Sequence, residues 1–324
     1  MFDVVGLGEL LIDWTPAGIS PTGMRLFEQN PGGAPANVLT CLSNLGLKTA
    51  FIGKVGTDMH GNFLGRILSE KNIDISGLLY DDHVFTTLAF VELNPSGERN
   101  FSFARKPGAD TYLRTEELSK DILTHCSIFH FGSLSLTNEP ARSATLSAID
   151  MAKKSGSVIS YDPNYRPPLW ENEQQAVEQM RSVLPFVDCI KISDEELELV
   201  TGENNPSPAV EFLFNQGIKC IVITQGKNGA TGFVKQNTDF FLEQIPCPKV
   251  KVVDSTGAGD SFWGGFLYQF LQHKVKLEKL TPEQLRTCII FANATASLCV
   301  QKRGGIPAMP ALDEVLDFLK EFSI

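Results

Sequence analysis

The sequence predicts an α/β fold in which a central, mainly parallel sheet is covered by helices on both faces. Short β-rich segments alternate with helix-compatible segments of about 10–15 residues, the pattern of repeated βαβ units. The chain has 324 residues, of which 43% are hydrophobic and 20% are charged, so it can bury a large core. Because parallel strands are joined by crossover helices, we expect helices on both faces of the sheet.

Each strand is predicted from a short run rich in Ile, Val and Phe, and each helix from apolar residues at helical spacing. The predicted strands are residues 2–8, 49–55, 127–132, 158–162, 189–193 and 219–224, with a further β-rich run at 250–253. The predicted helices are residues 36–45, 61–71, 141–154, 174–184 and 208–216, and a helix-compatible stretch follows residue 260.

Two segments interrupt the alternation of strands and helices. Residues 86–93 and 99–104 flank Asn-Pro-Ser-Gly-Glu at 94–98, a strong turn signal, and predict a β-hairpin with no helix between its strands. Residues 14–30 contain Pro and Gly and carry little helix signal. We therefore expect a single domain over residues 1–324, with a small β-lid formed by insertions at about 14–30 and 86–105.

Composition excludes several classes of protein. The net charge of −10 disfavours a nucleic-acid scaffold. No apolar run approaches the roughly 18 residues of a spanning helix, and no signal-like segment is visible at the N-terminus. The seven cysteines form no CxxC pair and the five histidines no HxxxH pair, so we expect free thiols, no zinc and a cytoplasmic protein.

The strongest local signal is Asp-Ser-Thr-Gly-Ala-Gly-Asp at residues 254–260. Small residues at a helix start let backbone N–H groups approach an anion. Asp260 in the first turn has two interpretations: a helix cap, or a base that takes a proton from a hydroxyl attacking phosphorus. No Walker motif accompanies it, and Gly6-Leu7-Gly8 lacks the third glycine of a dinucleotide-binding motif.

A second signal is Pro-Gly-Gly-Ala-Pro-Ala-Asn at residues 31–37. Gly32 and Gly33 allow a close backbone approach, and the Asn37 amide can both donate to and accept from sugar hydroxyls. A plain turn and helix start explains the same residues equally well. Asp13, just after the first strand, is either a hydroxyl acceptor or a surface acid.

Together these segments resemble the ribokinase-like (PfkB) family of carbohydrate kinases over the whole chain, and within it the fructokinases most closely. The residues that carry the resemblance are 8–13, 32–38, 53–58 with Gly61, 162–166, 224–230 and 254–260. The resemblance implies a ribokinase-like fold with a β-lid. It also implies ATP-dependent phosphorylation of fructose, at the C6 hydroxyl, with Mg²⁺ and K⁺ as cofactors.

The resemblance further implies a role for each matching position. Asp260 would be the catalytic base, Gly257, Ala258 and Gly259 the anion hole, and Arg166 a contact to the transferring phosphate. The other implied sets are sugar binding by Asp13, Gly32, Gly33, Asn37 and Arg105; nucleotide binding by Asn164, Ser193, Thr224, Gly226, Gly229 and Asn293; a magnesium shell ordered by Glu196; and a potassium site at Asp254, Thr256, Cys299 and Gly304.

Two alternatives to a fructokinase stay open at this point. An Arg at the end of the hairpin suits a neutral sugar or an acid such as 2-keto-3-deoxygluconate. Residues 103–105 read Phe-Ala-Arg, without the aromatic beside Arg105 that such acid-sugar kinases more often show, which favours fructose. The other alternative is a sugar-sensing relative without catalysis, which the intact 257–260 segment disfavours.

The expected partners are a small-molecule sugar and ATP. Neither nucleic acid nor membrane is expected, and the resemblance implies a homodimer that pairs through the lid.

Overall fold

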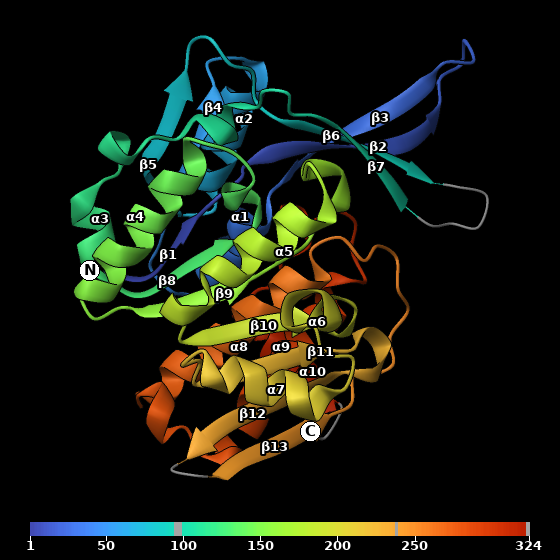
Figure 1. The fold of residues 1–324 in the computed structure, drawn as a ribbon. Helices are drawn as coiled ribbons and strands as arrows, with labels where there is room; N and C mark the ends of the chain where they lie inside the picture. Colours follow the sequence, from blue (N-terminus) through green and yellow to red (C-terminus); the bar gives the residue numbers. More distant parts are fainter. Residues whose placement is uncertain (94–98, 237–238, 322–324) are drawn as a thin grey trace.

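The computed structural model describes residues 1–93, 99–236 and 239–321. A nine-stranded sheet in the order β13-β12-β11-β10-β9-β8-β1-β4-β5 forms its centre (Figure 1). The strands from β11 to β5 pair in parallel, whereas β12 and β13 run antiparallel at one edge. Their bounds are β1 Phe2–Leu7, β4 Thr49–Gly56, β5 Asp74–Asp81, β8 Cys126–Gly132, β9 Val158–Asp162, β10 Cys189–Ser193, β11 Cys220–Thr224, β12 Ala230–Gln236 and β13 Asp239–Ile245. This confirms the mainly parallel central sheet.

Helices cover both faces of the sheet, as expected (Figure 1). Successive strand residues point to opposite faces, so Val5 packs in one apolar cluster and Val4 in the other. The first cluster lies beneath α3 Lys120–Thr124, α4 Ala141–Lys154, α5 Glu173–Ser182, α6 Asp194–Thr201 and α7 Pro206–Asn215. The second lies beneath α1 Ala34–Asn44, α2 Met59–Glu70, α8 Ala258–His273 and α9 Pro282–Cys299, with α10 Leu312–Glu321 packed on α9.

A separate four-stranded sheet in the order β3-β2-β6-β7 extends away from the central sheet (Figure 1). Its strands are β2 Leu11–Ile19, β3 Arg25–Gly32, β6 Leu88–Leu93 and β7 Arg99–Ala104. The two interruptions predicted from the sequence therefore meet in one small sheet, which we call the lid sheet. The turn predicted at 94–98 lies outside the described residues.

One predicted strand is wrong. Residues 250–253 form no strand, and the side chains of Val252 and Val253 are 61% and 53% exposed. The Val253 N–H donates to the Val300 carbonyl at 2.7 Å, so this segment is tied to the end of α9 instead of to the sheet. The antiparallel pair β12 and β13, which the sequence analysis did not identify, occupies the sheet edge.

The parallel strands place the predicted site residues at one edge of the sheet. Strand β9 ends at Asp162, β10 at Ser193 and β11 at Thr224, each a residue of a segment singled out from the sequence. The carboxyl ends of parallel strands meet at one edge, where ligands bind in open α/β sheets. Among the described helices, none is both long and apolar enough to cross a membrane.

Candidate active site

Two cavities meet at the start of α8. The first, of about 280 Å³, is lined by Asp260 together with Asp13, Gly33, Asn37 and Arg166, and we call it the Asp260 cavity. The second, of about 490 Å³, is the Asn293 cavity, and its wall includes Thr224, Gly226, Gly229 and Asn293. Ser255, Ala258 and Gly259 line both cavities. The segment that precedes and opens α8 is therefore a wall common to the two.

Glycine is required at the entry to α8. Gly257 has φ of 75°, a left-handed conformation, and a Cβ there would lie 3.0 Å from the Met309 side chain and 3.1 Å from Gly305 Cα. With no side chain at this N-cap position, no side-chain cap covers the first backbone N–H groups of α8. The helix end can therefore receive an anion at the point where the two cavities meet.

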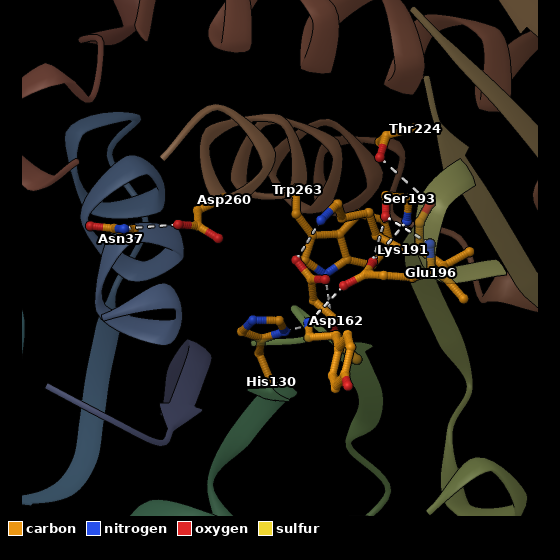
Figure 2. A network of polar contacts seen from close by, with 12 residues as sticks. Asn37, His130, Asp162, Lys191, Ser193, Glu196, Thr224, Asp260 and Trp263 are labelled. Carbon is orange, nitrogen blue, oxygen red and sulfur yellow. Dashed lines mark hydrogen bonds and ion pairs between the residues drawn. The ribbon is translucent and has the colours of Figure 1, made fainter. Parts of the chain in front are cut away.

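Asp260 lies in the first turn of α8 and is 8% exposed. Asn37 Nδ2, on α1, donates to Asp260 Oδ2 at 2.8 Å (Figure 2). Burial raises the pKa of Asp260 above its ordinary value, and the Asn37 hydrogen bond and the charges of Lys191 and Arg166 oppose that shift. A buried carboxylate with a raised pKa, facing a cavity, has the chemistry of a general base.

Asp13 on β2 and Asn37 on α1 line the same cavity, close to the two glycines that join β3 to α1. A Cβ at Gly32 would overlap the Asp13 carboxylate, and a Cβ at Gly33, whose φ is 120°, would overlap the Glu9 carbonyl oxygen. Both glycines thus make room for neighbouring groups. Gly33 lines the cavity, whereas Gly32 does not line it and instead leaves the space that the Asp13 carboxylate occupies.

The six residues assigned to the nucleotide lie in three places, and Ser193 lines neither cavity. Four of them lie in one wall, that of the Asn293 cavity: Thr224, Gly226, Gly229 and Asn293. Asn164 instead lines the Asp260 cavity. Ser193 caps α6, and its hydroxyl donates to Glu196 Oε2 at 2.9 Å.

Glu196 is bonded within the protein through both carboxylate oxygens. Oε1 accepts the Tyr165 N–H at 2.7 Å, and Oε2 accepts the Ser193 N–H at 3.0 Å. Glu196 therefore joins the start of α6 to the loop that follows β9. Among the described residues, no group of three or more His, Cys, Asp or Glu side chains is arranged to hold a metal ion.

The four residues assigned to a monovalent cation lie together. Asp254 Oδ1 accepts the Thr256 N–H at 2.8 Å, and Oδ2 accepts the Gly304 N–H at 3.0 Å. The Cys299 thiol donates to the Thr256 carbonyl at 3.7 Å. A loop closed by these contacts lies directly before the Gly257–Gly259 segment.

Arg105 does not line the Asp260 cavity, and its assignment as a direct sugar contact stays a prediction. Its Nε donates to Asp110 at 2.8 Å, Nη1 to Thr137 at 2.9 Å and Nη2 to the Leu134 carbonyl at 2.9 Å. The guanidinium is buried and lines a third cavity. Arg105 thus supports the loop at Leu134, which does line the Asp260 cavity.

Sequence reasoning missed two charged residues in this wall, Glu9 and Lys191. Glu9 is 3% exposed and its Oε1 accepts the Ala34 N–H at 2.8 Å; burial raises the pKa of its carboxyl to about 7. Lys191 pairs with Asp162 (Figure 2). A charged residue inside an apolar parallel strand, as in Cys-Ile-Lys-Ile-Ser at 189–193, is the signal that would have revealed Lys191.

The comparisons with known sequences point to one family. The model of the pfkB family of carbohydrate kinases matches residues 1–312. A protein described as probable fructokinase-7 from Arabidopsis thaliana is 42% identical over 321 residues, covering 98% of this chain and 92% of its own.

Solved structures give the same picture. A fructokinase from Xylella fastidiosa with bound ATP has a TM-score of 0.90 at 31% identity, with both chains fully covered. A fructokinase double mutant from Vibrio cholerae O395 with fructose, ADP and a potassium ion has a TM-score of 0.86 at 29% identity, over 98% of each chain. A protein described as a putative ribokinase II from E. coli with ATP and Mg²⁺ reaches 0.86 at 27% identity, over 99% of this chain and 100% of its own.

Proposed function

This chain belongs to the pfkB family of carbohydrate kinases, and from that premise we propose that it transfers the γ-phosphoryl group of ATP to fructose. One observation carries the proposal: two cavities share a wall at the start of α8, and Asp260 faces the first of them. A phosphoryl group at that shared wall would lie within reach of a donor on one side and an acceptor on the other.

The Asp260 cavity holds the acceptor in this proposal. Asp13 and Asn37 offer a carboxylate and an amide that suit the hydroxyls of a neutral sugar. Phe101 and Phe103 of the lid sheet close another side with apolar rings. Because these two residues of the lid sheet form part of the wall, the lid sheet is placed to close over the bound sugar. Closure would limit the access of water to the phosphoryl group.

The Asn293 cavity holds the donor. Its wall combines small residues with apolar ones such as Val250 and Phe262, and such a wall suits the planar adenine ring of ATP. Asn293 Nδ2 donates to the Ile245 and Pro246 carbonyls at 3.2 and 3.3 Å, which fixes the orientation of its amide in this wall. The triphosphate would then run toward Gly259 and the start of α8.

Chemistry at the shared wall follows from these positions. The C6 hydroxyl oxygen of fructose forms a bond to the γ-phosphorus, and the bond from phosphorus to the bridging oxygen breaks, leaving its electron pair on ADP. The hydroxyl proton passes to Asp260. The N–H groups at the start of α8 and the Arg166 guanidinium stabilise the nonbridging oxygens.

Two cations belong to this proposal, as in the related structures with ATP and Mg²⁺ and with ADP and potassium. Magnesium, when bound with ATP, neutralises phosphate charge. Glu196 fits an ordering role more than direct coordination, because both of its oxygens accept hydrogen bonds inside the protein. Both Asp254 oxygens likewise accept N–H groups, those of Thr256 and Gly304, so Asp254 orders this loop and the loop's backbone carbonyl oxygens, beside the anion site, would hold the potassium ion.

The direct test is an ADP-release assay with MgATP and K⁺ on fructose, 2-keto-3-deoxygluconate, ribose and adenosine in parallel. We expect turnover on fructose to dominate and the product to carry its phosphate on C6. Dominant turnover on the keto acid would retain the chemistry but overturn the acceptor. A protein that binds sugar without turnover on any of the four would contradict the enzyme assignment.

A further inference from the structure

Lys191 is a buried cation whose presence the fold alone does not require. It lies on β10 between Ile190 and Ile192, which point into the apolar cluster on the opposite face, and its side chain is 7% exposed. Placing an ammonium group at such a position has a large desolvation cost, and a well-packed apolar pair often replaces a buried ion pair without loss of stability.

The Lys191 ammonium is aimed at the start of α8. Nζ donates to Asp162 Oδ2 at 2.8 Å and would lie 3.1 Å from a Cβ built on Gly259. An ammonium has three N–H donors, and among the described residues Asp162 is its one hydrogen-bond acceptor. Lys191 also lines the Asp260 cavity. In Figure 2 the Asp162–Lys191 pair lies on one side of Asp260, and Asn37 lies on the other side.

The lysine remains charged in this environment. Burial alone lowers the pKa of Lys191, but the nearby Asp162 and Glu196 carboxylates outweigh burial and hold the pKa above its ordinary value. Asp162 has a second carboxylate oxygen, Oδ1, that is buried without a hydrogen-bond partner among the described residues. The Lys191 ammonium is thus a positively charged group, held by Asp162 from one side, next to the proposed phosphoryl site.

We propose that Lys191 is a catalytic residue that contacts a nonbridging oxygen of the phosphoryl group in transfer. The proposal rests on the proposed function. In the transfer the acceptor oxygen bonds to phosphorus, the electron pair of the broken P–O bond leaves with ADP, and the acceptor proton goes to Asp260. Lys191 keeps all its protons and supplies charge stabilisation from the sheet, while the α8 N–H groups supply it from the helix. Asp162 is its positioning residue.

The chain offers a matched control for the alternative, a merely structural ion pair. Lys54 on β4 is also buried in the parallel sheet, with a side chain 4% exposed, and donates to Glu117 at 2.6 Å. It lines neither the Asp260 cavity nor the Asn293 cavity. Lys54→Met therefore removes a comparable buried charge away from the proposed chemistry.

The experiment compares wild type, Lys191→Met and Lys54→Met by steady-state kinetics, thermal unfolding and calorimetric binding of fructose and ADP. Wild-type turnover on the four acceptors decides the proposed function first, and the variants are then measured on the acceptor that turns over. In folded Lys191→Met we expect kcat to fall about 100-fold or more, with the KM for sugar and the Kd for ADP changed by less than about threefold. Lys54→Met should lower the melting temperature and keep kcat.

Either of two results would overturn the role of Lys191. One is a folded Lys191→Met protein with kcat within about fivefold of wild type. The other is an equal loss of kcat in Lys54→Met, which would trace both losses to general destabilisation. If Lys191→Met does not fold, Lys191→Gln, which keeps an N–H donor for Asp162 without the charge, is judged by the same criterion.

Discussion

At the residue scale, the chemistry depends on how Asp260 is held. Burial raises the pKa of its carboxyl. Among the described residues, one side-chain hydrogen bond to this carboxyl opposes the shift, and Asn37 donates it. A carboxyl with a raised pKa is protonated, and inactive as a base, at a higher pH than an exposed aspartate. We therefore expect kcat to fall as the pH decreases through that raised pKa.

Replacing Asn37 tests this electrostatic balance. Asn37→Ala removes the hydrogen bond that lowers the pKa of Asp260, so the acid limb of the kcat–pH profile should move to higher pH. The measurement is kcat at saturating sugar across the pH range. Asn44→Ala is the control, because Asn44 is on the same helix but donates to the Met309 carbonyl at 2.8 Å. An acid limb that stays in place or moves to lower pH in Asn37→Ala would contradict the proposed balance.

At the scale of elements, the turn that joins β3 to α1 positions the acceptor side of the site. Gly32 leaves room for the Asp13 carboxylate, and a methyl group there would displace it. Because the displaced atoms belong to a side chain, we expect Gly32→Ala to fold. The KM for sugar should rise about tenfold or more while the KM for ATP stays close to wild type.

Kinetics with each substrate varied in turn test the Gly32 prediction. Gly65→Ala on α2 serves as the control for the cost of changing a glycine, since its Cβ would likewise displace a side-chain group, the Tyr80 hydroxyl, and Gly65 lines neither cavity. An equal rise in both KM values of Gly32→Ala would show that the change disturbs more than the acceptor side.

The elements also show where sequence patterns were sufficient and where they were not. The helix predicted at 141–154 coincides with α4, and the predicted strand at 189–193 coincides with β10, because each has the apolar spacing of a buried element. The β-rich run at 250–253 has the same composition as a strand, yet Val250 and Val252 line the Asn293 cavity instead. Composition records apolar surface but does not distinguish a strand from the wall of a ligand cavity.

Some site residues can be predicted from short sequence motifs, whereas the positions of others depend on tertiary contacts. Asp260, Asn37 and Gly33 come from short motifs, and the structure brings all three to one cavity although Asn37 and Asp260 are far apart in the sequence. Arg105 also followed a motif, but its guanidinium is used by Asp110, Thr137 and Leu134, a tertiary arrangement that no local pattern encodes. Lys191 lies inside a strand of otherwise apolar character, outside every short motif, so only the folded sheet shows that it lines the cavity.

At the scale of the whole molecule, the lid sheet leaves apolar side chains in solvent. Ile19, Met24 and Leu26 are 71%, 68% and 45% exposed, and β3 is an edge strand of this sheet. Exposed apolar groups at a sheet edge favour association. The resemblance to the family adds the expectation of a homodimer through the lid, which stays a prediction.

Light scattering at several protein concentrations measures the mass in solution. We expect twice the mass of the chain for wild type and a shift toward the mass of one chain for Leu26→Glu, because burying a charge at a lid interface is unfavourable. Leu316→Glu is the control, because Leu316 is also 45% exposed but lies on α10, outside the lid sheet. A wild-type protein with the mass of one chain at every concentration would exclude lid pairing.

The central claim is that Asp260 takes the proton of the sugar hydroxyl during phosphoryl transfer from ATP. The measurement that tests it most directly is single-turnover phosphorylation of fructose by Asp260→Asn, with fructose binding measured by calorimetry on the same protein. Asparagine keeps the shape of the side chain and an oxygen that accepts the Asn37 hydrogen bond. The account predicts a rate at least about 1,000-fold slower than wild type with fructose binding largely retained. A folded Asp260→Asn protein that transfers phosphate at close to the wild-type rate would contradict it.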